Sequence, residues 1–203
     1  MSKGVKDIKP NLICTYMLEC ENNTSYEKIS SFNQIKLTNK TLVLCDIDDT
    51  IMHYPQCDKK CKEIVQDLKA NGLSGEDLMK ELIEIRQIYK RINPPSHTDY
   101  DGFVSMSDKL SELNGKLSFI TARDKASGSW TEKQLRQIGI DPLKYDIHYV
   151  GTQISKGEHI KLYIDLSDWD NVIFIDDYES YIKSVLDVHP EIKCYKFEAS
   201  STN

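Results

Sequence analysis

The 203-residue sequence lacks the long apolar runs that mark membrane-spanning or secreted proteins. No run approaches the roughly 18 apolar residues needed to cross a bilayer. The opening stretch, MSKGVKDIKPNLICTYM, has neither the apolar centre nor the small-residue cleavage site of a secretory signal. We therefore expect a soluble, intracellular protein of the cytoplasm, with no signal peptide and no membrane partner.

An excess of basic charge is also missing. The formal net charge is −6 and the isoelectric point is about 5.4. Proteins that bind a long nucleic-acid duplex usually carry a basic face, although a local basic patch can exist within an acidic chain. The composition therefore allows nucleic acid as a partner and does not favour it.

The cysteines show no metal-binding or disulfide pattern. Two of the six, Cys57 and Cys61, are spaced so that they share one face of a helix and could bind a metal together. A structural zinc site needs four ligands, and the chain has no second cysteine pair or HxxxH motif to supply the others. We expect free thiols and no zinc.

The chain also lacks internal repeats and low-complexity linkers, so its length suits one principal core. Residues 1–24 show no period and predict an irregular lead-in. Tyr26, Ile29 and Phe32 recur at helical spacing within TSYEKISSFNQI, which predicts a short helix packed on the core. We assign residues 1–39 to an N-terminal extension that contains this helix.

What the chain does have is regular alternation of apolar strands and amphipathic helices. The stretch TLVLCDI is apolar without alternation, as in a parallel strand covered on both faces. Ser129 with Glu132, and Ser155 with Glu158, have the spacing of capping boxes at helix starts. The pattern predicts an α/β fold with a doubly wound parallel sheet. The other predicted strands are residues 117–121, 146–150, 171–175 and 192–197, and the helices are residues 103–115, 129–140, 155–166 and 179–188.

Between the first strand and its return lies a charged insertion. Residues 57–70 and 74–92 both have helical periodicity and are joined by NGLSG, which predicts a helical hairpin. We assign residues 54–100 to this insertion, and residues 40–53 and 101–203 to the α/β core.

Carboxylates collect at the ends of two predicted strands. Asp46, Asp48 and Asp49 follow the first strand, and Asp176 and Asp177 follow NVIFI. The carboxyl ends of parallel strands meet at one crevice, so these acids should converge and require a cation. Carboxylate oxygens are the ligands that Mg²⁺ prefers. Solvated loop acids would explain a single pair, but two clusters that each end an apolar strand favour a site.

Four segments in order resemble the motifs of the haloacid dehalogenase superfamily. They are DIDDT at 46–50, ITAR at 120–123, Lys156 in SKGEHIKL, and FIDD at 174–177. The resemblance covers about residues 40–190 and is greatest to a poorly characterised phosphatase-like branch of bacteria and large DNA viruses. It implies a Rossmann-like core, a small helical cap formed by residues 54–100, and Mg²⁺-dependent hydrolysis of phosphomonoesters through an aspartyl phosphate.

The resemblance also implies a role for each motif residue. Asp46 would be the nucleophile, and Asp48 would be the general acid and base. Thr121 and Lys156 would hold the transferred phosphoryl group, with Arg123 as a further substrate contact. The residues implied in metal binding are Asp46, Asp48 through its backbone carbonyl, Asp176 and Asp177.

Several neighbouring residues have a structural reading beside the functional one. Lys161 competes with Lys156 for the third motif but lies a turn further into the helix. For Arg123 a surface ion pair is favoured over a substrate contact, because a loop arginine more often forms such a pair. His53 is read as incidental to the site, with a substrate contact as the alternative. Trp130 is read as packing at a helix start, with stacking on a base as the alternative.

The motif residues are compatible with three functions. They are a phosphomonoester hydrolase, a nucleic-acid 3′- or 5′-end phosphatase, and a non-catalytic protein that binds a phosphorylated ligand. For the first, we expect a small molecule or nucleotide as substrate. Residues of the insertion that could border the cleft are Tyr54, Lys59, Lys60, Arg86, Tyr89, Lys90 and Arg91. The sequence does not indicate an oligomeric state.

Overall fold

The computed structural model describes residues 25–199, so the predicted lead-in lies outside the described residues. A six-stranded sheet forms its centre, with strand order β1-β8-β7-β2-β5-β6. Every neighbouring pair in this sheet is parallel, which confirms the predicted doubly wound parallel architecture. The strands are β1 (Tyr26–Ile29), β2 (Thr41–Cys45), β5 (Lys116–Thr121), β6 (Asp146–Tyr149), β7 (Asn171–Asp176) and β8 (Lys193–Phe197).

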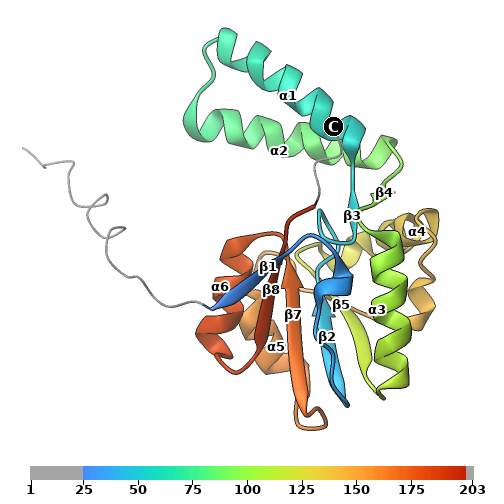
Figure 1. Cartoon of the computed structure of the whole chain (residues 1–203). Coiled ribbons are helices and arrows are strands. Elements are labelled where there is room, and N and C mark those ends of the chain that lie inside the picture. Colours follow the sequence, from blue (N-terminus) through green and yellow to red (C-terminus); the bar gives the residue numbers. More distant parts are fainter. Residues whose placement is uncertain (1–24, 200–203) are drawn as a thin grey trace, which may run out of the picture.

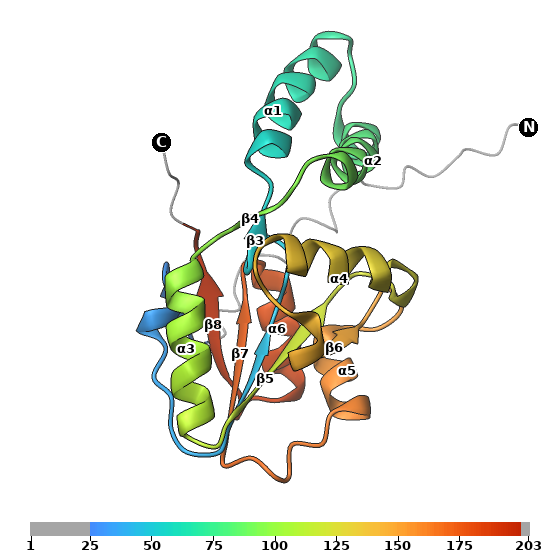
Figure 2. The same ribbon diagram turned by 90° about the vertical axis from the view of Figure 1, so that its right-hand side faces the viewer.

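Helices cover both faces of this sheet (Figures 1 and 2). Alternate residues of β2 point to opposite faces: Val43 and Cys45 join one apolar cluster, while Leu42 and Leu44 join the other. β2 is buried on both faces, as its uninterrupted apolar sequence predicted. On the Val43 side lie α3 (Tyr100–Glu112) and α4 (Gly128–Gln137), and on the Leu42 side lie α5 (Lys156–Tyr163) and α6 (Glu179–Val188).

The prediction of a helix within residues 24–35 is wrong. Tyr26–Ile29 instead forms β1, an edge strand that pairs with β8. Ser31 then caps a single 3-10 turn by accepting a hydrogen bond from the backbone N–H of Asn33. Such a local side-chain bond to the backbone competes with regular secondary structure. Phe32 in this turn is buried and stacks on Phe197 at a centroid distance of 4.7 Å. The helical spacing of the apolar residues therefore reflects a strand followed by a turn.

The insertion after β2 forms a helical hairpin of α1 (Pro55–Ala70) and α2 (Gly75–Ile92). It stands beyond the carboxyl ends of the sheet strands (Figure 1). A two-stranded antiparallel ribbon of β3 (Met52–His53) and β4 (Ser96–His97) connects it to the core. The two predicted helices of the insertion are thus present, and we refer to α1 and α2 as the cap hairpin.

Helix starts show which local signals were reliable. Ser155 and Glu158 form the predicted capping box at the start of α5. At α4 the prediction is wrong by half a turn, because the helix begins at Gly128 and Ser129 lies inside it. No helix among residues 25–199 combines the length and apolar character required to cross a bilayer.

Candidate active site

The acids at the ends of β2 and β7 converge. Asp46 directly follows β2, and its backbone N–H donates to the carbonyl of Ile175 at 2.9 Å, which ties it to the adjacent strand. Asp176 is the last residue of β7, and Asp177 follows it. Asp46, Asp176 and Asp177 each offer a carboxylate oxygen, and these three oxygens lie within 4.8 Å of one another.

Lys156 lies between two of these carboxylates. Its ammonium donates to Asp46 Oδ1 at 2.6 Å and to Asp176 Oδ2 at 2.7 Å, while its side chain is only 1% exposed. Burial opposes the charged form, but the two carboxylates outweigh it and raise the pKa of Lys156, which therefore stays protonated. The ammonium also faces the ring of Tyr181 at 4.7 Å from its centroid.

Local structure fixes Lys156 in this position. It is the first residue of α5, directly after the Ser155 capping box. The next residue, Gly157, lies so close to α6 that an added Cβ would collide with the backbone oxygen of Ser184. Glycine therefore lets α5 pack tightly on α6, and this packing places the start of α5 over the strand ends.

The donor set fits a hard divalent cation. Asp46, Asp176 and Asp177 provide oxygen ligands only, as Mg²⁺ requires. Burial, with the charges of Asp176 and Asp49, raises the pKa of Asp177 to about 7. A divalent cation bound by Asp177 would offset these causes. The side chain of Asp48, a predicted metal residue, is not part of this group.

Asp48 instead forms ion pairs with Arg123 and Lys90. Arg123 binds its carboxylate with two nitrogens, Nε at 2.7 Å from Oδ2 and Nη2 at 3.0 Å from Oδ1. Lys90 of the cap hairpin adds a third contact, Nζ at 2.9 Å from Oδ1. Burial would raise the pKa of Asp48, but these two cations hold it far below its usual value. Asp48 is therefore a carboxylate here.

A buried polar network fixes Arg123. Its Nη1 donates to Thr131 Oγ1 at 3.0 Å and to Gln134 Oε1 at 2.9 Å, and its Nη2 donates to the Tyr54 hydroxyl at 3.0 Å. Gln134 also donates through Nε2 to the backbone carbonyl of Lys90 at 3.1 Å. The network links the second motif to α4 and to the cap hairpin.

Comparisons with known proteins give structural matches only. No protein-family model and no curated protein matches the sequence. A haloacid dehalogenase-like family hydrolase from Xanthomonas campestris superposes with a TM-score of 0.54, covering 88% of this chain and 89% of that one at 12% identity. The chain has a haloacid dehalogenase-like fold.

Two other hydrolases of this superfamily agree with that assignment. The haloacid dehalogenase-like protein SP0104 from Streptococcus pneumoniae has a TM-score of 0.53 at 15% identity, with 77% of this chain and 83% of that chain covered. A superfamily hydrolase from Ehrlichia chaffeensis has a TM-score of 0.51 at 14% identity, with 81% and 90% covered. The likeness in each case establishes the fold.

The other residues considered from sequence lie at the end of β5 and in the loop between β2 and β3. Thr121 ends β5 and is buried, with its hydroxyl oxygen accepting from the backbone N–H of Arg123 at 3.2 Å. Thr50 donates to Asp177 Oδ1 at 3.5 Å. Asp49 adopts a left-handed backbone with φ of 61°, which fits the tight turn after the first motif.

Of the cap residues considered from sequence, three reach the site: Tyr54, Lys90, and Arg86, whose Nη2 lies 3.3 Å from Asp49 Oδ2. Lys60 instead pairs with Glu63 on the surface of α1. Sequence reasoning overlooked Gln134. A polar residue at an inward position of α4, between the buried Thr131 and Leu135, was the signal that could have identified it.

The remaining alternatives are also located. Lys161 is exposed on α5, so Lys156 is the lysine that meets the acids. His53 lies in the β3–β4 ribbon. Trp130 packs its ring against the guanidinium of Arg123, at 4.5 Å from Cζ, in keeping with its structural reading.

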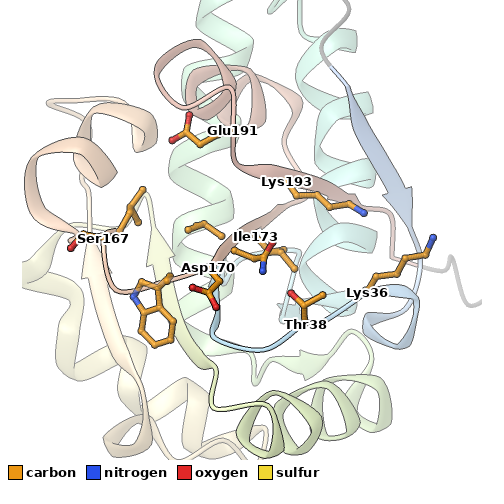
Figure 3. Close-up of a pocket in the computed structure, with 11 residues that line it drawn as sticks. Lys36, Thr38, Ser167, Asp170, Ile173, Glu191 and Lys193 are labelled. Carbon is orange, nitrogen blue, oxygen red and sulfur yellow. The ribbon is translucent and has the colours of Figure 1, made fainter.

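One cavity among the described residues lies away from this site. It has a volume of about 600 Å³ and lies at the amino end of β7, where Asp170, Ile173 and Lys193 border it (Figure 3). Both acidic and basic side chains line it, and none of the motif residues does. This cavity is therefore separate from the group of converging acids.

Proposed function

We propose that the protein is a Mg²⁺-dependent phosphomonoester hydrolase that acts through an aspartyl phosphate on Asp46. The observation that carries the proposal is the buried contact of Lys156 with both Asp46 and Asp176. An ammonium fixed beside a nucleophilic carboxylate provides positive charge where a phosphoryl group gains negative charge during transfer.

The reaction has two displacements. Before the first, Asp48 takes up a proton from solvent. A carboxylate oxygen of Asp46 then attacks phosphorus, the ester P–O bond breaks, and Asp48 gives this proton to the leaving oxygen. In the second, water attacks the phosphorus of the aspartyl phosphate while Asp48 takes a proton from it. The bond to Asp46 then breaks and inorganic phosphate is released, which leaves Asp46 ionised and Asp48 protonated for the next cycle.

Other residues bind and orient the phosphoryl group. Lys156 and the Thr121 hydroxyl donate hydrogen bonds to its oxygens. Burial raises the pKa of Asp46 well above its usual value, and the ammonium of Lys156 opposes this rise. Asp46, Asp176 and Asp177 would hold a Mg²⁺ ion, whose charge would offset repulsion between the nucleophile and the phosphate. The acid step requires the ion pairs of Asp48 with Arg123 and Lys90 to loosen, because they favour its ionised form.

A direct test is phosphate release from an aryl phosphate with and without Mg²⁺. Wild-type protein should release phosphate only with the metal, and Asp46→Asn should abolish the activity. Asp108→Asn is the matched control, since Asp108 is an exposed residue of α3 away from the site. Inertness of the wild type over a broad panel of phosphomonoesters would overturn the proposal.

The same panel separates the two other functions considered from sequence. An end phosphatase should act on 3′- or 5′-phosphorylated oligonucleotides far better than on small esters, with binding that weakens steeply with salt. A non-catalytic protein should bind phosphorylated ligands without releasing phosphate. The presence of Asp46, Asp48, Lys156 and Asp176 together favours turnover over binding alone.

A further inference from the structure

A small cavity lies where the end of the cap hairpin meets α4, beside the proposed active site. Its volume is about 200 Å³. We call it the Arg91–Lys133 pocket. Its lining residues are Arg91, Ile92, Asn93 and Pro94 at the end of α2 and beyond it, and Trp130, Lys133, Gln134 and Gln137 on α4.

The Arg91–Lys133 pocket shares two of its walls with the network around Asp48. Gln134 lines the pocket and accepts a hydrogen bond from Arg123 at 2.9 Å. Trp130 lines it too, and its ring packs against the same guanidinium. Arg123 therefore contacts both the wall of this pocket and Asp48, the proposed acid and base.

The charges of this pocket are unlike those of the rest of the site. Arg123, Lys90 and Arg86 all pair with carboxylates. Arg91 and Lys133 are exposed, and within residues 25–199 neither side chain has an ion pair or hydrogen bond. No carboxylate is among the lining residues. The pocket therefore presents two uncompensated cations and the amide of Gln137, which is a donor set suited to an anion.

We propose that the Arg91–Lys133 pocket binds a second phosphate group of the substrate. The inference rests on the proposed function and narrows it to phosphomonoesters that carry another phosphate. The volume suits one phosphate with a few adjoining atoms and is too small for a whole drug-sized ligand. A guanidinium and an ammonium bind phosphate oxygens in complementary ways, the first as a planar fork and the second as a point charge.

The kinetic test compares a hexose bisphosphate with the corresponding monophosphate. Wild-type protein should prefer the bisphosphate in kcat/KM, and Arg91→Gln or Lys133→Gln should each reduce this preference about tenfold, as expected when a charge-assisted hydrogen bond is lost. Lys80→Gln, at an exposed lysine nearer the tip of α2, should keep the wild-type preference. Equal preference in all four proteins would overturn the proposal.

Binding to the Asp46→Asn protein distinguishes failure of this proposal from failure of the proposed function. Titration calorimetry with the two hexose phosphates should show that the Asp46→Asn protein binds the bisphosphate more tightly than the monophosphate. Adding Arg91→Gln to Asp46→Asn should remove this margin in affinity. If the margin is present and no wild-type turnover occurs, the pocket stands and the hydrolase does not. If turnover occurs and the margin is absent, the hydrolase stands and the pocket does not.

The source of the second phosphate is identified with oligonucleotides that carry a terminal phosphate. A preference that appears only when a phosphodiester follows the terminal nucleotide, and that Lys133→Gln reduces, assigns the pocket to a nucleic-acid strand end. A preference confined to the hexose bisphosphate assigns it to small molecules. Both results support a second-phosphate subsite, and the lack of any preference in either series overturns it.

Discussion

The proposed site has two parts that hold charge in different ways. The floor, which we define as Asp46, Lys156 and Asp176, is almost fully buried and belongs to the core. The rim pairs Asp48 and Asp49 of the first-motif loop with Arg123 from the end of β5 and with Arg86 and Lys90 from the cap hairpin; its side chains range from 8% to 45% exposed.

This difference separates charges fixed by the fold from charges that can change partners. Breaking a buried ion pair leaves an unpaired charge in a poorly solvated place and costs about 3–5 kcal/mol, whereas exposed pairs contribute about 0–1 kcal/mol. The floor should therefore be sensitive to every substitution, while the rim can exchange contacts when substrate arrives. Four substitutions test this contrast.

The largest effect is expected from Lys156→Met, which removes the cation of the floor. Two buried carboxylates would then face each other without compensation, so the free energy of unfolding should fall by about 3–5 kcal/mol in metal-free buffer at pH 8. Phosphate release should fall by about 10²–10³-fold. Lys161→Met on the exposed surface of α5 should change neither quantity. Denaturant unfolding of the two variants gives the comparison, and equal stabilities would refute a fixed floor.

The next effect concerns Asp177, which borders the floor. Its pKa is raised to about 7 in the folded protein, above the value of about 4 for an unfolded chain. The folded state therefore binds more protons between these values, and metal-free protein should lose stability as pH rises from about 4 to about 7. Saturating Mg²⁺ should reverse the loss at pH 7, because the cation replaces the proton.

Thermal unfolding against pH measures this effect. Asp177→Asn should flatten the pH dependence of Tm in metal-free buffer and weaken the stabilisation by Mg²⁺ at pH 7. Asp108→Asn, at an exposed aspartate of α3, should leave both as in the wild type. A wild-type Tm that rises between pH 5 and pH 7 without metal, with the same slope in Asp177→Asn, would contradict the assignment of Asp177.

The contrast between floor and rim also explains which parts were predictable from sequence. The floor follows from two apolar runs, because a run buried on both faces has to be a central strand and its carboxyl end has to meet its neighbour's. Lys156 was identifiable because a capping box marks the start of its helix. These are local patterns with one dominant structural solution.

The rim was less predictable, because its partners are long side chains on charged helices. Lys59, Lys60, Lys90 and Arg91 look alike in sequence, and only the packing of the cap hairpin selects Lys90 to reach Asp48. The strand β1 was missed for a related reason. An edge strand is stabilised by pairing with its neighbour in the sheet. The neighbour of β1 is β8, which lies more than 160 residues away in the sequence.

A smaller effect on stability is expected from Lys90→Met in the rim. The ion pair with Asp48 is partly exposed, so the free energy of unfolding should change by at most about 1 kcal/mol. Its clearer effect is on pH dependence. Losing one of its two cations raises the pKa of Asp48, so a larger fraction of Asp48 stays protonated at a given pH. The pH profile of kcat should therefore shift to higher pH. An unchanged profile would show that Lys90 does not influence the acid.

The smallest effect is expected from Arg86→Gln, at the outer edge of the rim. Arg86 is 45% exposed on its side chain and lies 3.3 Å from Asp49, so salt should screen the pair. A double-mutant cycle with Asp49→Asn should give a coupling energy of about 0.2–1 kcal/mol at low salt that declines at 0.5 M NaCl. A coupling energy above about 2 kcal/mol that does not decline with salt would show that this ion pair behaves like the buried pairs of the floor. The cap hairpin would then be held to the core by fixed ion pairs and not by pairs that exchange partners.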